Sequence, residues 1–187
     1  MRRGFKSECE KRTTAARRAL QLAATAALDP WAYATHRKVL ILDIDALGLN
    51  AGCLRQLLKT DPESWSAMTL KDGSTFAILV NPAHHSTRQR SDLMHEIAHI
   101  DLKHLPARVE VSKTGLLLLS DYSDDQEQEA DWLGAALLVP RDGLMRMRRQ
   151  QKTVTEIAQY YGVSNVLCEW RLRMTGVDTQ IRRALSK

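Results

Sequence analysis

The stretch His95-Glu96-Ile97-Ala98-His99 decides how this chain is interpreted. It lies within residues 86–104, where apolar side chains recur at the spacing of an amphipathic helix. Residues four apart lie one turn apart on the same helix face, so two imidazoles placed this way can bind a single zinc ion. Glu96 would then lie beside the metal, where it can act as general base on a water molecule.

The plainer interpretation of this stretch is a surface helix with two solvated histidines. The sequence opposes it, because Ser86-Thr87-Arg88-Gln89 has the spacing of a capping box and the residues that follow present an apolar face. The helix is expected to open at Ser86 and to run to about His104, before Pro106. A metal site on a helix that faces the core is therefore the favoured interpretation.

A catalytic zinc site needs a third protein ligand, and the acidic run 124–131 offers one. Glu127 and Asp131 are four residues apart and share a helix face, so Glu127 is predicted to bind the zinc. Asp131 is predicted to accept a hydrogen bond from a zinc-binding histidine and so to fix its tautomer. Glu129 is the competing ligand, and an acid-rich helix start is the plain alternative to both. His104 is a poor third ligand, because it falls on the motif helix one turn further on.

These residues together predict hydrolysis of a peptide bond. Zinc lowers the pKa of its water from about 15.7 toward 7, so that Glu96 can take a proton and later pass it to the leaving amine. A hydrogen-bond donor to the developing oxyanion is also needed. Tyr33, Tyr122, His84 and His85 are candidates, and the sequence does not choose among them. The histidine pair also fits a polar turn ahead of the helix, which is the favoured interpretation.

The helices expected elsewhere surround this motif. They cover residues 4–28, a short helix from Pro30, 51–59, about 124–138, and the chain from 153 onward with a turn at 162–164. The expected domains are a metallopeptidase domain at 1–140 and a helical C-terminal subdomain at 141–187.

The expected strands make the fold class α+β. They cover residues 39–42, 65–70 and 75–80, and Asp72-Gly73 between the last two predicts a hairpin. One hairpin strand is expected to lie along the cleft and to pair with an extended peptide substrate. Residues 105–124 are expected to form a loop, with Leu116–Leu119 packed against the core.

The composition is that of an ordinary globular protein, with 44% hydrophobic residues among 187 and a net charge of +5. Residues 141–187 carry ten Lys or Arg against four acids, which fits either solvated helix faces or an acidic partner such as nucleic acid. Cys9, Cys53 and Cys168 are odd in number and widely spaced, as expected of reduced thiols in the cytoplasm. No apolar run is long enough to cross a membrane.

Several blocks of the chain resemble the ImmA/IrrE family of metallo-endopeptidases. They lie at residues 2–6, 64–69, 80–99, 127–131 and 134–140. The last two are the most specific. The family's third ligand lies fourteen positions, counted inclusively, before the proline that is Pro140 here, and this position is Glu127. Trp132-Leu133 departs from the Phe-Ala pair that is frequent in the family, which affects packing and not the ligands.

The resemblance implies a zincin-like fold, in which a small twisted sheet packs on the motif helix. It also implies a zinc endopeptidase whose substrate is a helix-turn-helix repressor of the Xre or phage type, encoded near the peptidase. Cleavage of such a repressor would relieve repression of its genes.

Residues 157–164 resemble the turn of a helix-turn-helix, with Gly162 in the turn and Ser164 as the next helix cap. Arg171 falls where a recognition helix needs apolar packing, so a subdomain that supports the cleft or docks the repressor is favoured. Direct DNA binding, or regulation by binding without cleavage, is the alternative. A purely structural zinc site is disfavoured, because it would need a fourth ligand, and no cysteine lies near the motif.

Overall fold

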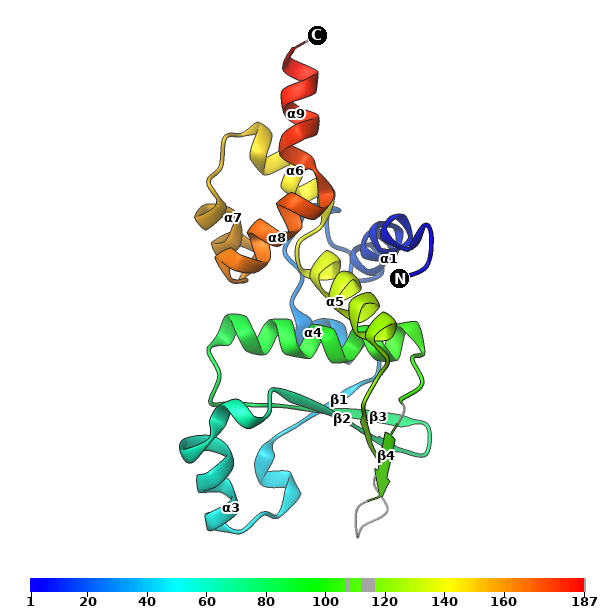
Figure 1. Ribbon diagram of the computed structural model, residues 1–187, viewed down its shortest axis with the longest axis vertical. Coiled ribbons are helices and arrows are strands. Elements are labelled where there is room, and N and C mark those ends of the chain that lie inside the picture. Colours follow the sequence, from blue (N-terminus) through cyan, green and yellow to red (C-terminus); the bar gives the residue numbers. More distant parts are fainter. Residues whose placement is uncertain (107, 112–116, 187) are drawn as a thin grey trace.

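The computed structural model describes residues 1–106, 108–111 and 117–186 as successive layers (Figure 1). Helix α4 (Ser86–Leu102) lies across one face of a mixed sheet. Helix α5 (Asp124–Leu138) packs over α4, helix α1 (Phe5–Ala19) packs against α5, and the C-terminal helices lie furthest from the sheet. This arrangement confirms the predicted α+β class with the motif helix against a small sheet.

Within the described residues the sheet has five strands in the order β1-β3-β2-β5-β4. Their bounds are Leu40–Leu42 for β1, Ala67–Asp72 for β2, Thr75–Val80 for β3, Arg108–Val111 for β4 and Leu117–Ser120 for β5. β1 runs parallel to β3, and the other neighbours are antiparallel. The predicted hairpin is β2–β3, and Gly73 in its turn has a φ of 54°, which glycine adopts without strain.

The expected loop at 105–124 is wrong, because β4 and β5 form within it. β5 pairs with β2 through Thr69 opposite Leu119, and β4 then pairs with β5. The leucine run has neither the alternation nor the β-branched residues of an evident strand, so long-range pairing decides its structure. Leu117 to Leu119 are half-buried, whereas Leu116 lies outside the described residues.

Helix α1 ends at Ala19, and the expected continuation to residue 28 is wrong. The reason is Arg17, whose side chain is fully buried. Its guanidinium donates to the carbonyls of Ala26 (2.9 Å) and Leu137 (2.8 Å), so the chain after the helix folds back around this cation. Helix α2 (Pro30–His36) begins at the predicted proline.

Helix α4 has a different cap from the predicted one. The backbone N–H of Thr87 donates to Nδ1 of His85, so His85 is the cap residue and Ser86 is already helical. Gln89 donates to the carbonyl of His84 (2.7 Å) instead of closing a capping box. The polar-turn interpretation of the His84-His85 pair is therefore confirmed.

Helix α5 starts as predicted, after a capping box formed by Ser123 and Gln126. A glycine sets its distance from α4, because a Cβ at Gly134 would lie 3.2 Å from the carbonyl oxygen of Met94. Both helices contribute to the core, with Leu93, Ile97 and Leu137 almost fully buried. The close approach brings the first half of α5 over the histidines of α4.

The C-terminal segment is helical, as predicted. Its elements are α6 (Arg141–Arg149), α7 (Val154–Tyr161), α8 (Asn165–Thr175) and α9 (Val177–Leu185). Arg171 of α8 is fully buried and donates to Glu10 of α1 (2.6 Å) and to the Val139 carbonyl (3.0 Å). Trp132 of α5 packs edge-to-face against Trp170. The proposed boundary after residue 140 stays a prediction.

Short helical segments fill the remaining connection between β1 and β2. They are the 3₁₀ turns η1 (Ile44–Leu47) and η3 (Pro62–Ser64), the helix α3 (Ala51–Arg55) and the π turn η2 (Gln56–Thr60). Of the helices in the described part of the chain, none has the length and apolar character needed to cross a membrane.

Candidate metal centre

Helices α4 and α5 bring His95, His99 and Glu127 together. One donor atom from each lies within 4.8 Å of the others. His95 Nε2 is 3.0 Å from His99 Nε2 and 3.1 Å from a carboxylate oxygen of Glu127, and the other Glu127 oxygen is 3.8 Å from His99 Nε2. Two imidazoles and a carboxylate are a donor set that suits zinc, so the residues present fit the predicted metal.

The second ring nitrogen of His95 is also held. His95 Nδ1 lies 2.9 Å from a carboxylate oxygen of Asp131, one turn along α5 from Glu127. Burial lowers the pKa of His95, but the bond to Asp131 and the nearby carboxylates outweigh it, so the pKa is raised overall. A carboxylate in this place fixes which ring nitrogen faces the ligand cluster.

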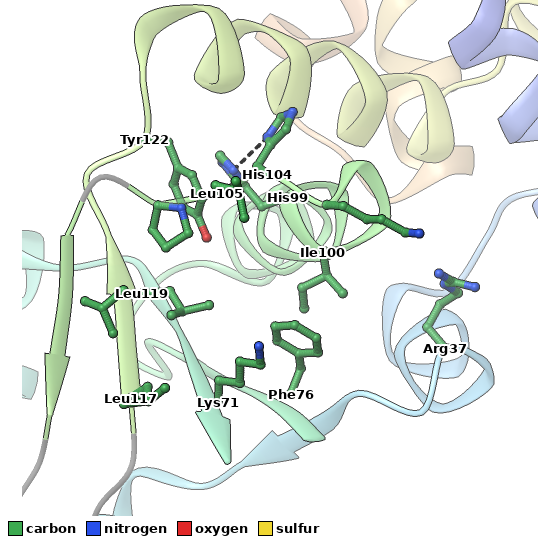
Figure 2. Close-up of a pocket in the computed structure, with 13 residues that line it drawn as sticks. Arg37, Lys71, Phe76, His99, Ile100, His104, Leu105, Leu117, Leu119 and Tyr122 are labelled. Carbon is green, nitrogen blue, oxygen red and sulfur yellow. Dashed lines mark hydrogen bonds between the residues drawn. The ribbon is translucent and has the colours of Figure 1, made fainter. Parts of the chain in front are cut away.

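His99 has a different partner, which the sequence did not indicate. His99 Nδ1 lies 3.0 Å from Nδ1 of His104, and Figure 2 marks this hydrogen bond with a dashed line. Burial and the neighbouring His95 and His104 lower the pKa of His99 to about 3. The ring is therefore neutral near pH 7, which is the form that binds metal.

His104 reaches His99 because the chain turns back at the end of α4. Lys103 has a φ of 57°, and the backbone N–H of His104 donates to the His99 carbonyl (3.0 Å). His104 Nε2 is 3.6 Å from a carboxylate oxygen of Glu129. Glu129, the competing ligand in the sequence, thus faces His104 and the backbone N–H of Arg2 (3.3 Å).

Glu96 follows His95 in the chain. The orientation of its carboxylate is fixed by Thr69, a residue that the sequence did not indicate. The hydroxyl of Thr69, a fully buried residue of β2, donates to the Glu96 carboxylate. Burial raises the pKa of Glu96, and the bond from Thr69 acts in the opposite direction. The signal available was a polar side chain between the apolar residues Met68 and Leu70 of the predicted strand.

Of the four oxyanion candidates, the structure brings only Tyr122 to the cluster. Its ring stacks on that of His99, with centroids 3.8 Å apart. Burial, together with the charges of Glu96 and Glu127, raises the pKa of Tyr122 to about 12, so its hydroxyl keeps its proton and can donate.

The other three candidates are engaged elsewhere. The hydroxyl of Tyr33 donates to Asp101 (2.7 Å), His84 lies against the Pro62 carbonyl (3.1 Å), and His85 caps α4.

Comparison with known protein families shows which family the chain resembles. A family model described as an IrrE N-terminal-like domain, Peptidase_M78, matches residues 59–173. The chain belongs to this family. The match confirms the resemblance found in the sequence and makes the protein a metallopeptidase. It includes both helices of the metal centre and continues past residue 140 into α8.

Two further comparisons gave no relative. No curated protein matches the chain significantly, and no solved structure does so either.

Proposed function

We propose that this protein is a zinc-dependent endopeptidase that hydrolyses a peptide bond within a protein substrate. The observation that carries the proposal is the convergence of three donor atoms within 4.8 Å, with Glu96 next to the first of them in the chain. His95, His99 and Glu127 would hold the zinc, which leaves a coordination position free, as in catalytic sites. Bound zinc supplies Lewis acidity, which polarises a carbonyl and acidifies water.

The protein's own residues supply the proton transfers. The Glu96 carboxylate takes a proton from the attacking water and delivers it to the nitrogen of the leaving amine. Thr69 holds that carboxylate in one orientation through its hydroxyl. The Tyr122 hydroxyl is the group best placed to donate a hydrogen bond to the carbonyl oxygen as negative charge develops there. Asp131 and His104 orient the two ligand histidines.

The hairpin offers a shorter free edge for pairing with a substrate than the sequence indicated. β3 is paired on both sides, with β1 and with β2, so it has no free edge over residues 77–79. β5 pairs with residues 69–71 of β2, and no strand in the described part of the chain covers the other side of Ala67 and Met68. Ala67 also borders a pocket with His95 and Glu96, so an extended substrate is proposed to pair there.

The proposed substrate is a DNA-binding repressor of the helix-turn-helix type, encoded near the peptidase and cleaved in the cytoplasm to relieve repression. Its support is the family resemblance together with the C-terminal helices, which offer a second surface for docking. The rival function is regulation by binding to the repressor or to DNA without cleavage. Arg171 gives this rival no support, because its side chain is fully buried against Glu10.

A pull-down from the native host tests the proposal, with Glu96→Gln as bait beside wild type and intact masses measured for what is captured. The proposal expects the variant to hold a full-length repressor and the wild type to release two fragments of it. The same intact partner on both baits would instead indicate regulation by binding, or a peptidase that awaits an activating signal, and would count against the proposal as stated. The fragment masses also identify the cleaved bond.

A further inference from the structure

A cavity of about 600 Å³ lies beside the metal centre, between α4 and the sheet (Figure 2). His99, His104 and Tyr122 form its wall on the side of the metal centre. Cavities of this size hold small ligands or parts of larger ones. The reacting carbonyl of a substrate would lie at His99 and Tyr122, so the adjoining part of the substrate is the natural occupant of this space.

The lining of the cavity is mostly apolar. Side chains from α4, from the segment after it and from three strands contribute, namely Ile100, Leu105, Phe76, Val109, Leu117 and Leu119. When an apolar group binds among them, water is released from its surface and from theirs, and this favours binding.

Three cations also line the cavity, namely Arg37, Lys71 and Lys103. Figure 2 shows Lys71 beside Phe76, and its ammonium lies 5.4 Å from the centre of that ring. Arg37 is paired with Asp101 (2.6 Å), but no carboxylate among the described residues forms a salt bridge with either lysine. The cavity therefore presents positive charge that this part of the chain leaves uncompensated.

A second pocket borders the metal centre at His95 and Glu96, whereas the cavity borders it at His99. Its volume is about 330 Å³, and its lining consists of Asp92, Glu96 and Asp131 with small or polar residues. No Lys or Arg of the described residues lines it, although Arg88 lies 3.7 Å from Asp92. A peptide that crosses the centre meets acidic walls on one side and an apolar, basic cavity on the other. The two flanks of the cleaved bond must therefore differ in chemistry.

We propose that the 600 Å³ cavity is a specificity subsite that takes a bulky apolar side chain of the substrate, with an adjacent acidic side chain paired to Lys71 and Lys103. This inference rests on the proposed peptidase function. The apolar side chain is buried against the leucines and Phe76, while the carboxylate meets complementary charge. The substrate segment that enters the cavity is thus a bulky apolar residue next to Asp or Glu.

Binding selection tests the subsite without requiring turnover. A library of random peptides is displayed and selected on immobilised, zinc-loaded Glu96→Gln protein. We expect about tenfold enrichment of peptides with a bulky apolar residue next to Asp or Glu, which is a typical preference for a pocket of this kind. Enrichment of unrelated sequences would overturn the inference.

Variants in the same background separate the two features. Val109→Trp fills the cavity from the edge strand, so the apolar preference should shift to Ala and Val. The double change Lys71→Glu and Lys103→Glu should turn the acidic preference into one for Lys or Arg, again by about tenfold, and leave the apolar preference in place. Lys11→Glu, an exposed lysine of α1, is the matched control and should change neither. Unchanged enrichment in both cavity variants would contradict the subsite.

Cleavage of the selected peptides by wild type separates the two levels of the proposal. Apolar-acidic peptides that bind but stay intact with zinc-loaded wild type would overturn the peptidase function and leave the subsite standing. Cleavage at bonds with no such flanking pair, together with unselective binding, would overturn the subsite and leave the peptidase function standing.

Discussion

His104 holds the imidazole of His99 in place, although it binds no metal in the proposed centre. Its Nδ1 is 3.0 Å from His99 Nδ1, and its Nε2 is 3.6 Å from Glu129. Residues that orient a metal-binding histidine typically contribute a factor of about 10–100 to metal affinity. The side-chain contacts from His99 through His104 to Glu129 therefore predict that His104, which is not a ligand, has a measurable effect on metal affinity.

We expect His104→Ala to weaken zinc binding by about 10–100-fold, because the His99 ring loses its hydrogen-bond partner. The measurement is competition for zinc with a chromophoric chelator. His85→Ala, on the exposed cap of α4, serves as the control and should bind zinc as wild type does. Equal affinity of His104→Ala and wild type would show that His104 only fills space.

Thr69 acts on the base and not on the metal. Thr69→Val keeps the shape of the side chain but removes the hydroxyl that donates to Glu96, so we expect kcat to fall about tenfold with zinc content unchanged. In the wild type the hydrogen bond from Thr69 lowers the pKa of Glu96. Removing that bond therefore raises the pKa of Glu96 in the variant. Glu96 works in its deprotonated form, so the acid limb of the pH profile should move to higher pH. Thr69→Ser should restore both kcat and the position of the acid limb. A pH profile of Thr69→Val identical to that of wild type would exclude a role of Thr69 in holding Glu96.

At the scale of the elements, the contact between α4 and α5 sets the geometry of the centre. Gly134→Ala introduces a Cβ about 3.2 Å from the Met94 carbonyl oxygen, so the helices must separate. We expect unfolding to become easier by about 1–3 kcal/mol, with weaker zinc binding as a second effect. Gln128→Ala, on the exposed face of α5, should change the unfolding free energy by less than about 0.5 kcal/mol. Denaturant titration of both variants distinguishes a tight helix contact from a tolerant one.

The docking of α8 depends on a buried cation. Arg171→Ala removes the donor to the Val139 carbonyl and to one carboxylate oxygen of Glu10, whose other oxygen keeps the N–H of Arg141, so we expect a loss of about 2–4 kcal/mol in the free energy of unfolding. Arg173→Ala, two residues further on and exposed, should be nearly neutral. If instead Arg173→Ala were the more damaging change, the fully buried position of Arg171 would be contradicted.

Local signals predicted the helices better than they predicted the strands after α4. α5 was predictable, because acids at its start and the proline after it are local signals. β4 and β5 were not, since β5 forms only by pairing with the distant β2 and β4 only by pairing with β5. The end of α1 depends on Arg17 reaching two distant carbonyls, which no local pattern indicates.

The same distinction holds for the site. His95, Glu96 and His99 follow from one helical spacing, and the motif therefore predicted their proximity. Thr69 and His104 reach the centre by strand register and by a left-handed turn at Lys103, and neither can be deduced from spacing along the chain.

At the scale of the whole molecule, helix α1 joins the metal centre to the C-terminal helices. Its Arg17 binds the end of α5, and its Glu10 binds Arg171 of α8. The peptidase centre and the helix-turn-helix-like segment are thus fixed to one common element. A repressor docked on the C-terminal helices would be held at a defined distance from the cleft.

Zinc content is the measurement that tests the central claim most directly. Wild type, Glu127→Ala and Asp124→Ala are purified in parallel, and their zinc is measured by elemental analysis together with protein concentration. The account predicts about one zinc per chain for wild type and for Asp124→Ala, an exposed residue of the same helix, and loss of most of the metal from Glu127→Ala. Full zinc occupancy in Glu127→Ala would contradict the proposed metal centre.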